Sequence, residues 1–451
     1  MELSNRNVLV AGAGVTGRAV TETLLAEGAE VTVTDGRAER LAPLADTGAR
    51  LLPGLAEPPS GTALVVTSPG WRPDAPLLAT SAAAGIEVIG EVELAWRLCA
   101  RSSTPPVWLV VTGTNGKTTT VGMLESILCA AGLDAVACGN VGLPVVAAMS
   151  HRVLAVELSS FQLHWSPSVR PDAGALLNIA EDHLDWHGSF EAYARAKATA
   201  LTGAVAVGNL DDRLAAELLA RSPAGHKIGI TLGEPRQGQL GIRDVHLVDR
   251  AFAADEPLAE VAAVRPAGTP GLIDALAAAA LARAHGVPSR AVADGLRAFR
   301  PADHRAVVVA ESGGITYVND SKATNPHAAA ASLRAHERVV WIAGGLLKGA
   351  AVDELVAEAA GRLAGVVLIG ADRQVIAAAL ARHAPDVPVV QVPAGDDEPM
   401  TTAVGVASEL ARPGDVVLLA PAAASMDMFT DYGHRGRAFT EAVRARLAGA
   451  S

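Results

Sequence analysis

The feature that most constrains the fold is the run Thr112-Gly-Thr-Asn-Gly-Lys-Thr-Thr119, which follows an apolar segment and precedes a helix-like one. Its glycines let successive backbone N–H groups converge into a nest for phosphate oxygens. Lys117 adds a cation and the Thr118 hydroxyl can bind Mg²⁺, as in a P-loop. The usual spacing places glycine where this chain has Val111, so the loop is a variant that starts at Gly113. The pattern predicts a strand, a phosphate-binding turn and a helix.

A second glycine loop, Gly12-Ala-Gly14-Val-Thr-Gly17, lies near the start of the chain. We expect a strand over Asn7 to Ala11 before it, a helix over Thr16 to Glu27 after it, and a strand over Glu30 to Thr34 that ends at Asp35. This is the dinucleotide fingerprint, with an acidic residue about 20 positions further on. It indicates a ligand that carries a diphosphate. NAD, FAD and nucleotide sugars all fit.

Short apolar runs alternate with Ala- and Leu-rich stretches along the chain, which favours βα units and parallel sheets. At about 150 residues per domain, a chain of this length predicts three domains. The segment Arg101-Ser-Ser-Thr-Pro-Pro106 and the pair Arg300-Pro301 are the expected junctions. We therefore expect domains at 1–100, 101–299 and 300–451. Further predicted elements are strands at Val107–Val111, Val307–Ala310, Val339–Ala343, Gly365–Ile369 and Asp415–Leu419, and a helix at Ala275–Ala284.

Composition narrows the functional class. Half of the residues are hydrophobic and the formal net charge is -11, which argues against general nucleic-acid binding because phosphate neutralisation needs clustered Lys and Arg. The three cysteines fit a reducing cytosol better than a disulfide-stapled secreted protein. Neither a signal peptide nor an apolar stretch of the ~20 residues needed to span a bilayer is apparent. We expect a cytoplasmic protein that binds no membrane.

Acidic and histidine residues close two later apolar runs. Val153 to Glu157 reads as a strand that ends in a carboxylate, which can hold Mg²⁺ directly or through water beside the phosphate loop. The second run ends at Leu177-Asn178 and is followed by Glu181-Asp-His183-Leu-Asp185. A lone histidine is more often structural than a ligand. Together with Lys117, Thr118 and Glu157, however, His183 is interpreted as part of a metal site.

These motifs together resemble the Mur ligases, the ATP-dependent enzymes that build the peptide of the peptidoglycan precursor. The resemblance extends in order along almost the whole chain. It is carried by Gly113-Thr-Asn-Gly-Lys-Thr118, Glu157-Leu-Ser-Ser-Phe-Gln162, Asn178, Glu181-Asp-His-Leu-Asp185, Ala196-Lys197, His304-Arg305, Asn319-Asp-Ser-Lys-Ala-Thr-Asn325, Ala343-Gly-Gly345, Lys348 and Ala424-Ser-Met-Asp427. The N-terminal glycine loop with Asp35-Gly-Arg37, and the run from Asp320 to Asn325, are most similar to the members that add D-glutamate.

The resemblance implies an α/β fold of three domains: an N-terminal Rossmann-like domain for the UDP substrate, a central P-loop ATPase-like domain and a C-terminal Rossmann-like domain for the amino acid. It implies a ligase that adds D-glutamate to UDP-N-acetylmuramoyl-L-alanine through an acyl phosphate. ATP, two Mg²⁺ ions and a carbamate on Lys197 are the implied cofactors. The implied partners are these small-molecule substrates, and we expect a monomer.

The resemblance also implies roles for individual residues. The catalytic residues would be Lys117, His183 and Lys197, and the metal ligands Thr118, Glu157 and His183. The ATP contacts would be Gly113, Thr114, Asn115, Gly116, Lys117, Thr118, Thr119, Arg305, Asp320 and Lys322. The UDP-substrate contacts would be Val15, Thr16, Asp35, Arg37, Ser68, Gly70, Asn140 and Gln162. The D-glutamate contacts would be Thr324, Lys348, Ser425 and Tyr432.

Two departures from the family pattern stand out. Tyr432 takes a position where the family often has Phe, which keeps stacking but changes polarity. Gly268-Thr-Pro-Gly-Leu-Ile-Asp274 stands where members usually have His-Asn-x-x-Asn, so nucleotide contacts from that segment are in question.

Three alternative functions are weighed against this interpretation. A nicotinamide-dependent dehydrogenase would use the first glycine loop but leaves the phosphate loop unexplained. A non-enzymatic nucleotide switch would bind nucleotide without forming an amide. A related ligase for another amino acid, including the folylpolyglutamate type, shares the central chemistry, and the N-terminal domain disfavours the folate member.

Overall fold

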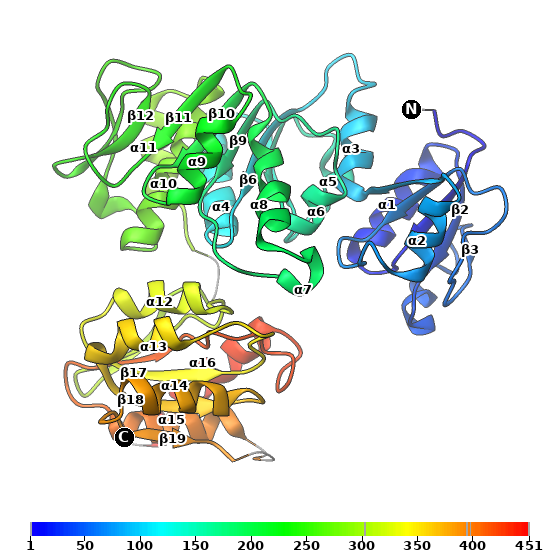
Figure 1. Cartoon of the computed structure of the whole chain (residues 1–451). Coiled ribbons are helices and arrows are strands. Elements are labelled where there is room, and N and C mark those ends of the chain that lie inside the picture. Colours follow the sequence, from blue (N-terminus) through cyan, green and yellow to red (C-terminus); the bar gives the residue numbers. More distant parts are fainter. Residues whose placement is uncertain (1, 302–303, 394–395, 397, 450–451) are drawn as a thin grey trace. The chain divides into compact units, whose positions relative to one another are not determined.

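The computed structural model describes residues 2–301, 304–393, 396 and 398–449 (Figure 1). Its contacts divide the chain into two compact units. The first comprises Met1–Ala267 with Gly271–Phe299, and the second comprises Gly268–Pro270 with Arg300–Ser451. The three domains expected at 1–100, 101–299 and 300–451 stay predictions, because this division gives two units. In the described part of the chain, no helix combines the length and apolar character needed to cross a membrane.

The first unit begins with a five-stranded parallel sheet in the order β3-β2-β1-β4-β5. Its strands are β1 (Asn7–Ala11), β2 (Glu30–Thr34), β3 (Arg50–Leu51), β4 (Leu64–Thr67) and β5 (Glu87–Gly90), and its helices are α1 (Val15–Ala26), α2 (Pro76–Ala83) and α3 (Glu91–Cys99). The first two strands match their predicted bounds because apolar runs of this kind, bounded by turn residues, suit strands buried on both faces. This order brings the first glycine loop to the carboxyl edge of the sheet, where such folds bind ligands.

The central sheet of the first unit has nine strands in the order β14-β13-β12-β11-β10-β9-β6-β8-β7. The strands are β6 (Val107–Thr112), β7 (Ala135–Gly139), β8 (Val153–Glu157), β9 (Ala173–Leu176), β10 (Val205–Asn209), β11 (His226–Ile230), β12 (Gln239–Arg243), β13 (His246–Asp249) and β14 (Glu256–Glu260). The pairs β12–β13 and β13–β14 are antiparallel, which differs from the expected parallel pattern. These strands follow one another through short turns, and such turns can join only antiparallel neighbours.

Helices cover both faces of the central sheet. They are α4 (Lys117–Ala130), α5 (Val145–Ala148), α6 (Ser160–His164), α7 (Leu184–His187), α8 (Phe190–Ala198), α9 (Arg213–Arg221), α10 (Thr269–Ala284) and α11 (Ser289–Ala298). On one face, α4, α10 and α11 contribute to a single buried core. On the other face, a second core continues from the central strands through α5 and α3 into the N-terminal sheet. The two sheets of the first unit therefore share one apolar core.

The second unit contains a six-stranded sheet in the order β15-β16-β20-β17-β18-β19, in which only the pair β15–β16 is antiparallel among the described strands. The strands are β15 (Val307–Ser312), β16 (Ile315–Asn319), β17 (Val339–Gly344), β18 (Leu363–Ile369), β19 (Val389–Gln391) and β20 (Val416–Leu419). The helices are α12 (Pro326–Arg334), α13 (Asp353–Ala359), α14 (Arg373–His383), α15 (Pro399–Leu410) and α16 (Tyr432–Gly449). Each face of this sheet buries its own apolar cluster.

Glu91, the first residue of α3, is an acid inside the core shared by the two sheets. Its side chain is 2% exposed, and one carboxylate oxygen accepts the Val146 N–H at 2.7 Å. The other oxygen has no hydrogen-bond partner. Burial raises the pKa of Glu91 from 4.5 to about 7, against the opposing effect of the Val146 and Val145 amides.

This raised pKa predicts a pH-dependent loss of stability. Between pH 4.5 and about 7 the folded state holds a proton on Glu91 that the unfolded state has released, so the free energy of unfolding falls as pH rises through this window. Glu91→Gln cannot titrate and should therefore gain stability relative to the natural chain between pH 5 and pH 8, by up to about 3 kcal/mol.

Urea unfolding of both proteins at several pH values measures this difference. Glu22→Gln, on the exposed side of α1, is the control and should keep the natural pH dependence. If the free energy of unfolding changed with pH in the same way in the Glu91→Gln variant and in the natural chain, the prediction would be contradicted.

Candidate active site

The phosphate loop joins β6 to α4 through backbone geometry that requires glycine. Gly116 precedes the first turn of α4 at φ +86°, in the left-handed region. A Cβ there would lie 2.3 Å from Asp274 Oδ1. Thr120, one turn into α4, donates to the same Asp274 oxygen at 3.1 Å. Asp274 therefore holds the back of the loop against α4.

Asn178, just after β9, holds the other side of the phosphate loop. Its side-chain oxygen accepts the Asn115 N–H at 2.9 Å, its amide donates to the Asn115 carbonyl at 3.2 Å, and its own carbonyl accepts the Thr114 N–H at 3.0 Å. The Thr114 hydroxyl also lies 2.9 Å from the hydroxyl of Tyr193 on α8. These contacts fix the loop before any ligand binds.

Two lysines converge on the phosphate loop. Lys117 donates to the carbonyls of Gly113 and Thr114 at 2.9 and 2.8 Å. Lys197 on α8 is 2% exposed and donates to the Gly113 carbonyl at 2.7 Å. Desolvation first, and then the charge of Lys117, lower the pKa of Lys197 well below 10.5, while Asp182 and Glu157 oppose them. The Lys197 amine is therefore held in a site that disfavours its protonation.

Glu157 lies beside the loop at the carboxyl end of β8. It pairs in register with Val111 of β6 and with Gly139 of β7, and its side chain is buried. Its Oε1 accepts the Asn140 side-chain amide at 2.8 Å. A Cβ at Gly139 would meet the Glu157 carbonyl at 2.2 Å, so only glycine lets these two strands deliver Asn140 and Glu157 together.

His183 precedes α7 in a left-handed conformation, with φ 54°. Its Nε2 lies 3.6 Å from Asp182 Oδ2, and its ring packs on Phe161 with centroids 4.6 Å apart. Nearby, His187 contacts the Ser160 hydroxyl at 2.9 Å. Burial lowers the pKa of His187 to about 4, and the charges of His164, His183 and Lys197 contribute to this shift. His187 is therefore neutral at physiological pH.

The donor set suits Mg²⁺ that is shared with a phosphate. Among the described residues, no three His, Cys, Asp or Glu side chains form a ready metal cluster. Mg²⁺ commonly uses one or two carboxylates, water and substrate phosphates rather than a complete protein cage. Glu157 and the half-buried Thr118 supply oxygen donors of this kind, so the residues present fit the ion.

The residues of the phosphate loop differ in their exposure to solvent. Gly113, Thr114 and Thr119 are buried, whereas Asn115, Gly116 and Lys117 are partly exposed. Thr119 therefore faces the interior of the fold.

The first glycine loop forms the turn that the sequence predicts, and the structure adds the contacts of Asp35. A Cβ at Gly12 would lie 2.4 Å from Ser68 Oγ, and one at Gly17 would lie 1.8 Å from the Gly12 carbonyl, so both need glycine. Asp35 is buried and accepts the N–H groups of Ala13 and Arg37, each at 2.9 Å. Its carboxylate thus closes the loop from within the protein.

Other predicted substrate contacts have mixed accessibility. Val15 is 66% exposed at the start of α1, and Arg37, Gly70 and Asn140 are also exposed, while Thr16 and Ser68 are partly so. Gln162 is buried. Its side-chain oxygen accepts the Ser159 N–H at 3.0 Å in a capping box that begins α6. The oxygen of Gln162 is thus used for helix capping, a role the sequence interpretation did not include.

In the second unit, three loops meet at the carboxyl edge of the sheet. Ser321 and Ala423, from the loops after β16 and β20, are joined by Arg435 of α16, which donates to the Ser321 hydroxyl and carbonyl and to the Ala423 carbonyl. Leu346, from the loop after β17, pairs with Ala424. The predicted residues on these loops are Asp320, Lys322, Thr324, Lys348 and Ser425.

Lys322 and Tyr432 come together in this unit, with the Lys322 ammonium 3.7 Å from the Tyr432 ring centroid. Asp320 Oδ1 accepts the Ala306 N–H at 3.2 Å, which brings the Arg305 segment to the end of β16. Desolvation raises the pKa of Asp320, while Arg305 is among the groups that oppose this rise. Lys348 is exposed, whereas Ser425 is buried.

Several residues of the site went unrecognised in the sequence. Asp274, Tyr193 and Arg435 carry no local motif, and each contacts a segment far away in the chain. Arg72 also joins two distant segments, because its guanidinium donates to the Asp185 carbonyl at 2.8 Å. Asp274 was noted only as part of a departure from the family pattern. Its position behind Gly116 gives that segment a defined structural role.

Gly116→Ala should impair nucleotide binding much more than Gly132→Ala. Both glycines flank α4 at positive φ, +86° and +75°, but a Cβ at Gly132 would meet nothing within 4 Å. The backbone strain of about 1 kcal/mol is therefore common to both variants. Only the alanine at position 116 also collides with Asp274.

Calorimetric titration with ATP, together with thermal unfolding, measures the difference. We expect the Gly116→Ala variant to lose at least about tenfold in affinity, equivalent to about 1.4 kcal/mol. Equal affinities of the two variants would show that Asp274 does not constrain the loop.

Comparisons with known proteins agree with this arrangement. Residues 6–90 match the Mur ligase MurD-like N-terminal domain, residues 111–255 the Mur ligase middle domain, and residues 304–423 the Mur ligase glutamate ligase domain. Two solved structures share the fold at 18% identity. They are UDP-N-acetylmuramate-alanine ligase MurC from Thermotoga maritima (TM-score 0.60, 98% of this chain and 99% of that chain) and MurF from Acinetobacter baumannii (TM-score 0.61, 98% and 91%).

Curated relatives extend over nearly the full length. A protein of Rhodococcus jostii named UDP-N-acetylmuramoylalanine--D-glutamate ligase is 57% identical over 98% of this chain and 95% of its own length. Proteins of the same name from Nocardia farcinica (54% identical, 98% of this chain and 97% of that protein) and Mycobacterium tuberculosis (55%, 97% and 95%) are also similar. With three family domains in order and identities of this size, the chain belongs to the Mur ligase family.

Proposed function

We propose that this chain is an ATP-dependent ligase that joins D-glutamate to UDP-N-acetylmuramoyl-L-alanine, in the cytoplasmic synthesis of the peptidoglycan precursor. The observation that carries the proposal is the central phosphate loop with Lys117, Lys197 and Glu157 gathered around it. Full-length relatives of 54 to 57% identity that bear the name of this activity support the choice of substrates. The MurD-like N-terminal match argues against a folate-type ligase.

In this proposal, the loop amides and Lys117 hold the ATP phosphates, with Thr118 and Glu157 holding one Mg²⁺ and His183 helping to hold a second. When bound, Mg²⁺ supplies positive charge that offsets the charge developing on the transferred phosphoryl group. Lys117 now donates to loop carbonyls. We expect its ammonium to turn to the phosphates when ATP binds. Arg305, Asp320 and Lys322 are further proposed ATP contacts.

Lys197 is proposed to carry a carbamate. Carbon dioxide reacts with a neutral amine, and the Lys197 amine has a strongly lowered pKa because it is buried near Lys117. The reaction forms an N–C bond and releases one proton, so that the side chain becomes an anion. Such an anion would sit beside the phosphate loop, where Asp182 and Glu157 already lie close enough to affect the pKa of Lys197. It would favour a metal ion rather than repel it.

The nucleotide part of the substrate is proposed to lie at the first glycine loop. There Val15, Thr16, Arg37, Ser68 and Gly70 are accessible to different degrees, whereas Asp35 would act by shaping the loop. Asn140, at the edge next to Glu157, would contact the muramoyl part, and Gln162 would contribute through α6. The D-glutamate would be received by Thr324, Lys348, Ser425 and Tyr432.

The reaction then follows in balanced steps. The substrate carboxylate oxygen attacks the γ-phosphorus of ATP, which forms an acyl phosphate and releases ADP. The amine of D-glutamate attacks the acyl carbon, phosphate leaves and the nitrogen gives up a proton. Positioning and electrostatic stabilisation provide most of the catalysis in phosphoryl transfer. The proposed enzyme acts as a monomer on small molecules, without nucleic acid or membrane.

Lys117→Ala should lower kcat for ligation by about 100-fold or more, because a charged donor to the transferred phosphoryl group is lost. Lys227→Ala removes an exposed lysine of β11 and should leave the rate unchanged. Phosphate release is measured with all three substrates and with each omitted. Full activity of the Lys117→Ala variant, or phosphate release that does not depend on D-glutamate, would contradict the proposal.

The carbamate predicts a second, independent result. The natural protein, kept at neutral pH in bicarbonate, should show by native mass spectrometry the added mass of one carbon dioxide, and acidification should remove it. Lys197→Ala should abolish both this mass and most of the activity, whereas the Lys227→Ala variant should retain both. An unmodified but fully active natural protein in carbon dioxide-free buffer would exclude a required carbamate.

A further inference from the structure

Helix α3 directs two buried carboxylates into contacts that connect the first two sheets. It follows β5, the edge strand of the N-terminal sheet. Glu91 and Glu93 in its first turn are 2% and 0% exposed. Both accept hydrogen bonds from segments that follow strands of the central sheet. These contacts lie inside the first unit.

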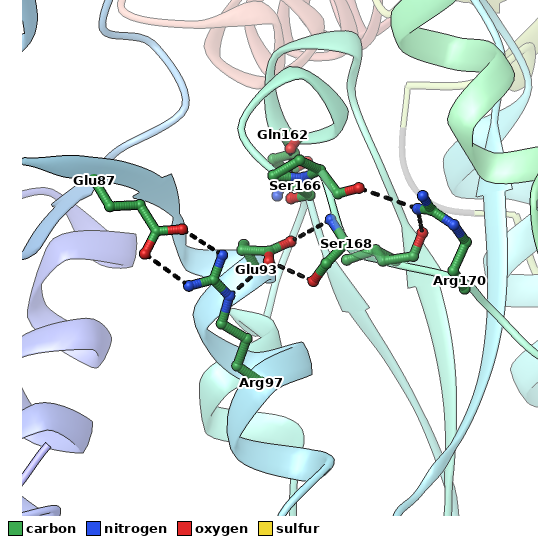
Figure 2. Close-up of polar contacts among 9 residues, drawn as sticks. Glu87, Glu93, Arg97, Gln162, Ser166, Ser168 and Arg170 are labelled. Atoms are coloured by element: carbon green, nitrogen blue, oxygen red, sulfur yellow. Dashed lines mark hydrogen bonds and ion pairs between the residues drawn. The ribbon is translucent and has the colours of Figure 1, made fainter. Parts of the chain in front are cut away.

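Figure 2 shows the contacts of Glu93. One carboxylate oxygen accepts the Ser168 N–H at 3.0 Å, and the other accepts the Ser168 hydroxyl at 2.5 Å and Arg97 Nε at 2.7 Å. Arg97 reaches outward and binds Glu87 of β5 through two hydrogen bonds of 2.7 and 3.0 Å (Figure 2). Five hydrogen bonds thus connect β5, α3 and the segment after α6.

The backbone packs tightly at the same place. Gly90, the last residue of β5, donates its N–H to the Trp165 carbonyl at 2.8 Å. A Cβ at Gly90 would lie 2.9 Å from Trp165 Cβ. The start of α3 is therefore held close to Trp165. This close contact fixes the position from which Glu93 reaches Ser168.

Glu91 makes the corresponding contact on the other side. It accepts the Val146 N–H at the start of α5. Helix α5 directly follows the loop that carries Asn140, whose side chain donates to Glu157. The segment bound by Glu93 belongs to the stretch that begins at Ser159, two residues after Glu157. The two carboxylates of α3 thus hold the two loops on either side of Glu157.

The cost of burying these charges argues for a geometric role. Burying a carboxylate carries a large desolvation penalty, and replacing buried ionic groups by well-packed apolar ones is often neutral or stabilising. Directional hydrogen bonds, in contrast, fix the distance between two loops in a way that apolar packing does not. Misplacement of a reacting group by about 1 Å can lower the rate by 10²-fold.

We propose that Glu91 and Glu93 are positioning residues of the ligation, which set the nucleotide-sugar loop of the N-terminal sheet at the right distance from Glu157 and the phosphate loop. The substrate then spans the two sheets with its carboxylate aimed at the phosphate to be transferred. This inference rests on the proposed function. Helix α3 would thus position the nucleotide-sugar substrate through the two loops, without contacting any substrate directly.

The kinetic test compares Glu93→Gln, Ser168→Ala and Glu91→Leu with the control Glu87→Gln. Glu87 belongs to the same hydrogen-bonded series but contacts only Arg97 in it. We expect kcat/KM for the muramoyl substrate to fall about tenfold or more in the three variants, while KM for ATP stays within about twofold because the phosphate loop has its own supports. Glu91→Gln keeps an acceptor for Val146 and should restore most of the rate lost in the Glu91→Leu variant.

A second measurement works without any substrate. Hydrogen exchange should increase in residues 139–148 of the Glu91→Leu variant and in residues 159–170 of the Glu93→Gln variant, with no increase for Glu87→Gln. If exchange increases in these two variants but the natural protein has no ligase activity, the proposed function is overturned, whereas the structural link between α3 and the two loops stands. Unchanged exchange, or equal increases in KM for all substrates, would overturn the positioning role of α3.

Discussion

The structure depends on the backbone of the loop from Gly113 to Thr119 being held in one conformation before a ligand arrives. Asn178 pairs with both backbone groups of Asn115, and Asp274 closes the back of the loop at Gly116. A nest of N–H groups attracts phosphate only while these groups point the same way. The buried Lys197 donates to the Gly113 carbonyl at the same place, and its burial disfavours protonation of the amine.

A second constraint is the alignment of two sheets that each carry a glycine loop. The apolar core that continues from one sheet into the other provides the bulk of the contact. It is the carboxylates of Glu91 and Glu93 that select a register, because hydrogen bonds are directional and apolar packing is much less so. In the second unit, the buried guanidinium of Arg435 acts similarly between loops that carry Ser321 and Ala423.

Much of the fold could be predicted because its signals are local. The strands Asn7–Ala11 and Glu30–Thr34 have their expected bounds, and β6 extends the predicted strand by one residue to Thr112. The antiparallel β12 to β14 and β15 to β16 were not expected, since the apolar runs of parallel and antiparallel strands are similar. For the site, the phosphate loop and Glu157 were recognisable from their place at strand ends.

The sequence by itself determined the α/β architecture, the two glycine loops and the family, since each depends on residues close together in the chain. Only the tertiary structure decided how several polar side chains are used. Asp35 accepts two backbone amides around its own loop, Gln162 caps α6, and Glu91 is buried against α5. The physical reason is that a carboxylate or amide takes its partner from whatever the fold brings within about 3 Å, and segments distant in the chain leave no local pattern.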